Sequence, residues 1–189
     1  MKRTLIVIAL IAALIAPIWA QNTGTTPDGF EWYKDGNGIM ITKYTGTATT
    51  VRIPDRINNL PVVTIGDGAF DLLEGATRGI TSVVMPNTVI TIEERAFTDC
   101  SALTSVTLST SIREIKRNAF RRCTALTSIS LPASITTIGS TAFNGCTALT
   151  TVTIPASVTR ITFGANAFQG VTNLNAVSVA TLQRVGYVF

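Results

Sequence analysis

The 189-residue sequence contains no histidine, and only 14% of its residues are charged. Without histidine there can be no His-based catalytic triad, and the commonest general base and most zinc sites are excluded as well. The sequence also lacks a G-x-S-x-G motif, a phosphate-binding glycine loop and paired carboxylates that could share one strand rung. We therefore predict a protein that is not an enzyme and has no catalytic, cofactor-binding or metal-binding residues.

Long hydrophobic runs are absent except at the N-terminus. Met1-Lys2-Arg3 precedes a 12-residue apolar run, Leu5 to Ala16, and Pro17 precedes a small-residue cleavage point after Ala20. This order is typical of a secretory signal peptide over residues 1–20. A retained anchor is the alternative, but a helical membrane span needs about 20 apolar residues. We expect an exported protein, extracellular, on the cell surface or in the periplasm, with no membrane span after cleavage.

Positive charge is also modest once the signal peptide is removed. Loss of Lys2 and Arg3 leaves 13 basic residues against 11 acidic ones. The charge balance therefore gives no reason to expect a nucleic-acid partner.

Cysteine is scarce, with three residues placed 23 positions apart at Cys100, Cys123 and Cys146. Val171 occupies the equivalent place one repeat later, and an apolar position that accepts Cys or Val is expected to lie in the core. A disulfide between neighbouring coils stays open on distance alone. Side chains on parallel rungs point the wrong way for one, so we predict buried, reduced thiols.

The 23-residue spacing belongs to an internal repeat. Residues 126–148 read LTSISLPASITTIGSTAFNGCTA, residues 103–125 are a close variant, and residues 149–173 repeat the pattern with two extra positions. A fixed period of this size predicts a solenoid in which stacked coils share one core. An Ala-Phe pair marks each coil, at positions 69/70, 96/97, 119/120, 142/143 and 167/168.

Each coil should contain two short strands and one helical turn. In the central coil, Leu126 to Leu131 predict the first strand, which Pro132 ends. Ile135 and Ile138 predict the second strand, and Ser140 to Gly145 a single helical turn. The longer coils locate insertions at Asp71 to Gly79 and near Phe163 to Asn166, which we expect in rim loops.

The ends of the repeat region are less regular. Phe30 to Tyr33 and Ile39 to Thr42 flank the turn sequence 35–38, which predicts a β-hairpin. A calcium loop is the alternative for this turn, but it lacks further acidic ligands. Leu174, Val177 and Val179 suggest a last strand. The expected plan is a signal peptide (1–20), a flexible lead (21–29), an N-terminal hairpin cap (30–50), repeats (51–179) and a C-terminal tail or cap (180–189).

The order L-x-x-V/I-x-L/I-P, I-x-x-I-G and A-F-x-x-C over about residues 30–179 resembles the BspA-type leucine-rich repeats. The resemblance implies an α/β right-handed solenoid with a parallel sheet on one face. It also implies a secreted or surface protein that adheres to host or neighbouring-cell proteins. Ser109 replaces the proline of the motif, and Glu93 and Lys116 replace its glycine. We therefore expect that this glycine is not a strict backbone requirement.

The outward positions of the first strands are nearly all small hydroxyl residues. They form two predicted rows, 82/105/128/151/176 and 84/107/130/153/178. β-propensity and solubility would explain such rows. A flat surface that binds another protein, or ordered water or ice, are the functional alternatives. The candidate partner-binding residues in these rows are Ser105, Thr107, Ser128, Ser130, Thr151 and Thr153.

A second candidate is the basic run from 113 to 122, offset only by Glu114. It could bind an acidic glycan or an acidic protein patch. However, a shift of 23 residues places three of its cations opposite acids of the preceding coil, which predicts the ion pairs Glu93–Lys116, Glu94–Arg117 and Asp99–Arg122. Arg113 and Arg121 remain as candidate contacts.

Together these patterns predict a non-enzymatic, exported protein-binding module. Its partner would be an extracellular-matrix or host surface protein, or an acidic glycan. The alternative is a structural, self-assembling envelope protein that forms homo-oligomers by stacking through an uncapped C-terminal end, because the residues after Val179 do not make up a further coil.

Overall fold

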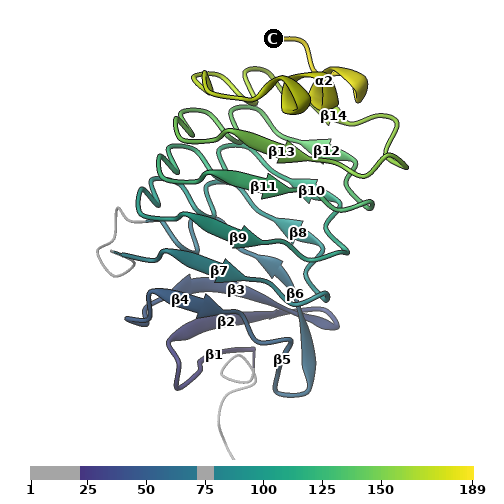
Figure 1. The fold of residues 1–189 in the computed structure, drawn as a ribbon. Helices are drawn as coiled ribbons and strands as arrows, with labels where there is room; N and C mark the ends of the chain where they lie inside the picture. The colour runs from purple at the N-terminus through teal and green to yellow at the C-terminus, as the bar shows by residue number, and fades with distance from the viewer. Residues whose placement is uncertain (1–21, 72–78) are drawn as a thin grey trace, which may run out of the picture.

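The computed structural model describes residues 22–71 and 79–189, which form a solenoid of stacked coils (Figure 1). Its first coils lie at one end and its C-terminal residues at the other. The predicted signal peptide and most of the predicted insertion at 71–79 lie outside the described residues. The predicted solenoid fold is confirmed.

The N-terminal end is closed by a β-hairpin, as predicted. Strands β2 (Phe30–Asp35) and β3 (Gly38–Tyr44) pair antiparallel. Gly36 adopts a φ of 57°, which glycine reaches without strain. The expectation of a flexible lead over 21–29 is corrected, because β1 (Thr23–Thr25) pairs with β2 and extends the sheet.

The second strands of the coils continue this sheet, which has nine strands. β3 pairs parallel with β6 (Leu60–Ile65), and β5 (Arg56–Ile57) folds back onto β6. Successive coils then add one two-residue strand each. These are β8 (Thr91–Ile92), β10 (Glu114–Ile115), β12 (Thr137–Ile138) and β14 (Thr162–Phe163).

The first strands form a separate side of the solenoid, in two sheets instead of the single sheet that was expected. Within each sheet, neighbouring strands pair in parallel, as stacked coils require. One sheet contains β4 (Thr50–Arg52), β7 (Ser82–Val84) and β9 (Ser105–Thr107), and the other contains β11 (Ser128–Ser130) and β13 (Thr151–Thr153).

The third side of each coil, here called the turn row, consists of hydrogen-bonded turns where single helical turns were predicted. Its amides donate to carbonyls of the next coil, as Phe120 N does to Ala142 O at 2.8 Å, and this competes with bonds inside a helical turn. The residue two positions before each phenylalanine has a positive φ, including 58° at Asn118 and 56° at Thr141.

The core contains a continuous column of aromatic rings. Phe97, Phe120 and Phe143 stack nearly parallel, with centroids 5.1 and 5.3 Å apart. These distances are close to the spacing of about 4.8 Å between paired strands, so equivalent rings meet face to face. Phe30, Tyr44, Phe70 and Phe168 extend the column to both ends.

The glycine of the I-x-x-I-G motif has close backbone neighbours in the coils that keep it. A Cβ on Gly139 would lie 2.6 Å from the backbone nitrogen of Arg117, and one on Gly164 would lie 2.2 Å from the backbone nitrogen of Ser140. Neither contact is possible without moving the neighbouring coil. Glu93 and Lys116 occupy the same position in their own coils, so the glycine is not required in every coil.

The C-terminal end is capped by a helix, so the predicted last strand is wrong, and of the two possibilities left open for the tail the structure shows the cap. Helix α2 (Ala176–Arg184) begins after Asn175, whose side chain accepts a hydrogen bond from Ser178 N. Ser178 and Leu182, one helical turn apart, are both buried against the last coil. The cap therefore starts at residue 176, earlier than the expected boundary at 180.

Candidate functional site

The predicted hydroxyl residues lie together on the first-strand side. Ser128 pairs with Thr151, and Ser130 with Thr153, in the parallel register of β11 and β13. Ser105 and Thr107 occupy the same positions on β9. We call these six residues the hydroxyl ladder. The rows do not continue to residues 176 and 178, because both lie in α2 and Ser178 is buried.

Some hydroxyls of the ladder form hydrogen bonds with other side chains, and others do not. Thr153 Oγ1 donates to Ser130 Oγ at 3.0 Å, and Asn175 Nδ2 donates to Thr151 Oγ1 at 3.3 Å. The hydroxyls of Ser105, Thr107 and Ser128 have no hydrogen-bond partner within the part of the chain that the structure describes, and all three residues are exposed. These three hydroxyls can donate and accept hydrogen bonds toward a partner.

A seam between β9 and β11 separates the two groups, since these strands belong to different sheets. On either side of it, the coils are joined by bonds such as Met85 N to Thr107 O and Leu131 N to Thr153 O, both 2.9 Å. The seam adjoins the coil in which Ser109 stands in place of proline. Ser109 is fully buried, and its hydroxyl accepts a hydrogen bond from Ser111 N at 3.0 Å.

The basic run forms two of its three predicted ion pairs. Lys116 Nζ lies 2.8 Å from Glu93 Oε1, and Arg122 Nη1 lies 3.6 Å from Asp99 Oδ1. The hydrogen bond to Glu93 raises the pKa of Lys116 above its ordinary value. The predicted pair between Glu94 and Arg117 is not formed among the described residues.

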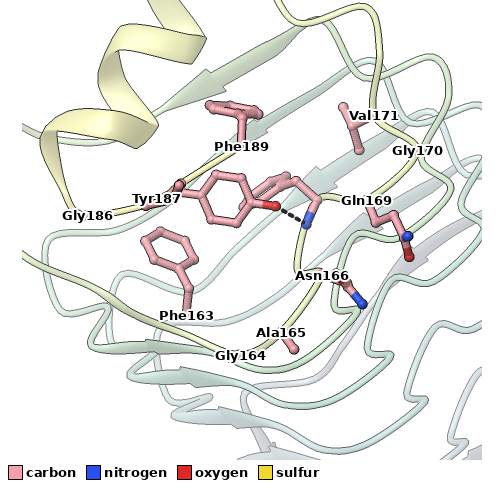
Figure 2. Close-up of a pocket in the computed structure, with 12 residues that line it drawn as sticks. Phe163, Gly164, Ala165, Asn166, Gln169, Gly170, Val171, Gly186, Tyr187 and Phe189 are labelled. Carbon is pink, nitrogen blue, oxygen red and sulfur yellow. Dashed lines mark hydrogen bonds between the residues drawn. The ribbon is translucent and has the colours of Figure 1, made fainter.

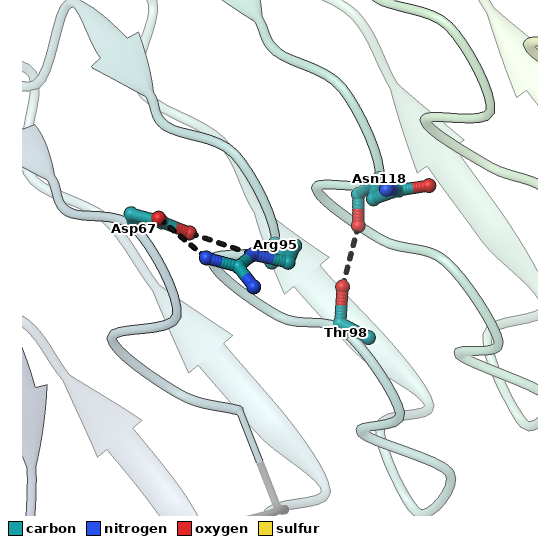
Figure 3. Close-up of polar contacts among 4 residues, drawn as sticks. All are labelled: Asp67, Arg95, Thr98 and Asn118. Carbon is teal, nitrogen blue, oxygen red and sulfur yellow. Dashed lines mark hydrogen bonds and ion pairs between the residues drawn. The ribbon is translucent and has the colours of Figure 1, made fainter.

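A further inter-coil pair joins Arg95 to Asp67, and the sequence reasoning missed it. Two guanidinium nitrogens of Arg95 donate to the two carboxylate oxygens, at 3.0 and 2.7 Å (Figure 3). Beside this pair, Thr98 Oγ1 donates to Asn118 O at 2.8 Å. Asp67 and Arg95 are 28 residues apart, because the insertion lies between them, so the 23-residue period does not predict this pair.

Arg113 and Arg121 retain unpaired side chains in the described structure. Arg113 is exposed just before β10, and Arg121 is partly exposed in the turn row after Phe120. The hydroxyl ladder lies on the first-strand side of the coil. The structure therefore places the candidate hydroxyls and the candidate cations in different stretches of the coil.

The three cysteines are buried free thiols, as predicted. Each donates from Sγ to a carbonyl of the preceding coil, for example Cys123 to Phe97 O at 3.2 Å. Burial raises the pKa of Cys100 and Cys146 to about 12 and holds the pKa of Cys123 well above its ordinary value. These thiols pack the core and stay protonated at neutral pH.

A pocket at the C-terminal end was not predicted. Its volume is about 530 Å³, and it lies between the last turn row and the tail after α2 (Figure 2). Phe163, Tyr187 and Phe189 surround it, and Tyr187 Oη accepts a hydrogen bond from Phe168 N at 3.2 Å. In the sequence, the aromatic residues of the C-terminal tail were the only features that could have indicated this pocket.

The described residues contain no group of three or more Cys, Asp or Glu residues placed to hold a metal ion. No helix in this part of the chain has the length and apolarity needed to cross a bilayer.

The repeat geometry agrees with the comparisons with known proteins. Residues 63–188 match the BspA type leucine-rich repeat region in six copies. The chain belongs to this family. No curated protein gives a significant match.

Solved structures of bacterial leucine-rich repeat proteins have the same fold. A leucine-rich repeat protein from T. pallidum is 25% identical and aligns over 87% of this chain and 97% of its own, with a TM-score of 0.56. One from Bacteroides capillosus is 28% identical over 71% of this chain and 99% of its own, with a TM-score of 0.63. A leucine-rich cell surface protein from Faecalibacterium prausnitzii is 27% identical over 81% and 53%, with a TM-score of 0.59.

Proposed function

We propose that this protein is a non-enzymatic, exported binding module that acts as an adhesin or cell-interaction factor. Its contact surface is the hydroxyl ladder together with the rim loops, and its partner is an extracellular-matrix or host surface protein. The observation that carries this proposal is the exposed, unpartnered group Ser105, Thr107 and Ser128. The cell surface neighbour from Faecalibacterium prausnitzii and the predicted signal peptide support export.

The chemistry of this surface suits a protein partner. The strands beneath the ladder are rigid, since their alternate residues Val106 and Ile129 are buried in the core. Short hydroxyl side chains lose little conformational entropy when a partner covers them. A partner that supplies backbone or amide groups could form hydrogen bonds with these three hydroxyls and span the seam that lies between them.

Binding of the purified protein to immobilised matrix proteins tests this proposal. We expect saturable binding to at least one of them. Replacing Thr107 and Ser128 by lysine should reduce the affinity at least tenfold, because two long cations would hold the partner away from the flat face.

The matched control is Thr162→Lys, which adds a lysine to an exposed position on the other sheet. This variant should bind as the wild type does. Absence of saturable binding to any matrix protein, or equal loss in the control, would count against the hydroxyl ladder as the contact surface.

Acidic glycans are a second candidate class of partner, favoured by the unpaired cations Arg113 and Arg121. If they are the contact, heparin binding should weaken steeply with salt. The double variant Arg113→Glu and Arg121→Glu should abolish it while leaving the circular dichroism spectrum unchanged. Retention of heparin binding in that variant would exclude these two residues.

A further inference from the structure

The turn rows of neighbouring coils are joined by a repeating set of three hydrogen bonds. In the central junction, the amides of residues 118, 120 and 122 donate to the carbonyls of residues 140, 142 and 144, at 3.1, 2.8 and 2.8 Å. The next junction repeats the set, from amides 141, 143 and 145 to carbonyls 165, 167 and 169, at 3.0, 2.8 and 2.9 Å. Each of these coils thus presents three amides, two residues apart, toward the C-terminal end of the stack.

The last turn row presents the same three amides, those of Asn166, Phe168 and Gly170. Among the described residues only the middle amide is bound, since Phe168 N donates to the hydroxyl of Tyr187 (Figure 2). This hydroxyl takes the role that an alanine carbonyl has at the lower junctions. Asn166 N and Gly170 N have no acceptor among the described residues.

The backbone of this row matches that of the coils below it. Asn166 has a φ of 59° and Gly170 of 77°, against 56° at Thr141 and 74° at Gly145. Its two open amides are therefore aimed in the direction in which every lower coil finds a carbonyl. Both residues line the pocket that Phe163, Tyr187 and Phe189 enclose.

We propose that this edge is a second docking site, and that its occupant is a segment of another polypeptide. The segment supplies two backbone carbonyls, four residues apart, to Asn166 N and Gly170 N. An apolar side chain of the same segment enters the aromatic pocket. The binding mode is the addition of one more chain to an open hydrogen-bonding edge.

The character of the pocket favours a polypeptide over a small anion. No lysine or arginine lines it, so nothing there neutralises a compact negative charge. The two open amides also lie on either side of the occupied Phe168 amide, so they need two separated acceptors. A backbone with regularly spaced carbonyls provides them, as each lower junction demonstrates.

A cyclic peptide that copies Gly139–Gly145 is the probe, because this segment supplies the equivalent carbonyls within the solenoid. Cyclisation lowers the entropy cost of forming the turn. With ¹⁵N-labelled protein, titration should shift the amide signals of Asn166 and Gly170 and slow their hydrogen exchange, with saturation at millimolar peptide. A peptide of reversed sequence should leave them unchanged.

Tyr187→Phe provides a sharper test, since it keeps the ring and frees the Phe168 amide for a third carbonyl. Affinity for the peptide should rise about two- to tenfold, the value of one added hydrogen bond. Tyr33→Phe, a tyrosine at the opposite end, should leave the affinity unchanged. Ala165→Asp, which places a negative charge in the pocket lining, should weaken binding. Absence of shifts at Asn166 and Gly170, or equal affinity of wild type and Tyr187→Phe, would overturn the proposal.

Discussion

The aromatic core is covered differently at a junction in the middle of the solenoid and at its C-terminal end. In the middle, one coil meets a near copy of itself, and Phe120 and Phe143 stack 5.3 Å apart with ring planes 4° from parallel. At the end, Phe168 meets the edge of Tyr187, with centroids 5.2 Å apart and ring planes 76° apart. Hydrophobic cover at the end is thus achieved without repeating the geometry of the coil.

At the C-terminal end, single groups of the cap take the place of the backbone acceptors that a further coil would provide. Val152 N donates to the hydroxyl of Ser178 at 2.9 Å, and Ile161 N donates to Val185 O at 3.0 Å. Arg184 Nη1 donates in the other direction, to Val158 O at 2.6 Å. A coil inside the solenoid forms hydrogen bonds along the whole of its neighbour. A cap has to supply partners only for those polar atoms that it buries.

Truncating the aromatic column should produce the largest difference between the two regions. Phe120→Ala removes a fully buried ring with stacked neighbours on both sides, so we expect a loss of about 3–5 kcal/mol in the free energy of unfolding. Phe189→Ala, at an end residue that is 57% exposed, should cost less than about 1 kcal/mol. Urea denaturation measures both, and equal losses would contradict the comparison.

Removing one replacement acceptor should have the next largest effect. Ser178→Ala leaves Val152 N–H buried without a partner, which costs about 1–3 kcal/mol. Hydrogen exchange at the Val152 amide should become faster. Thr181→Ala, in the same helix, should change stability by less than about 0.5 kcal/mol. If the two variants were equally stable, the hydroxyl of Ser178 would have no capping role.

A smaller gain is expected from relieving the backbone of the turn row. Arg122 has a φ of 58° at a position where later coils have Gly145 and Gly170. Arg122→Gly should raise the free energy of unfolding by up to about 1 kcal/mol, because the left-handed conformation is costly for other residues. Arg121→Gly, next to it but not at a positive φ, should lower stability by about 0.5–1 kcal/mol. Changes of the same sign would refute this account.

The smallest effect is expected from thiol reagents applied to the folded protein. At about pH 8, Cys100, Cys123 and Cys146 should not react, because burial holds their pKa above the ordinary value of 9.0. Since the folded pKa is raised, this contribution to stability is complete below about pH 9 and is lost as the pH approaches 12. Rapid labelling without denaturant, or unchanged stability across that range, would contradict their burial.

The repeat predicted those features that depend only on equivalent positions. The phenylalanine column, the buried cysteines and two inter-coil ion pairs all follow from the 23-residue period. The pair between Glu94 and Arg117 does not form, because register brings charges near one another but exposed ion pairs gain little from closing. Arg95 pairs with Asp67 at a spacing of 28 residues, because the insertion between them lengthens that coil.

The two ends and the turn row could not be predicted as well. Val177 and Val179 alternate as in a strand, but the N-cap at Asn175 and the buried pair Ser178 and Leu182 select a helix. Whether Ser140 to Gly145 forms a helical turn depends on carbonyls of the next coil, which local sequence does not contain. The open amides of the candidate docking edge are invisible to sequence for the same reason, since every residue carries an amide.

The three-bond junction described above also bears on how such a protein can change in length. Because consecutive junctions use the same set of three bonds, we expect that removal of residues 126–148 as a unit would bring together two turn rows that match. Both end structures would be kept, and the hydroxyl ladder would lose one rung. Duplication of the same segment would lengthen the ladder instead. The length of the binding face can therefore change when the gene gains or loses a segment that encodes a whole coil. Such a change would not require a new set of core residues.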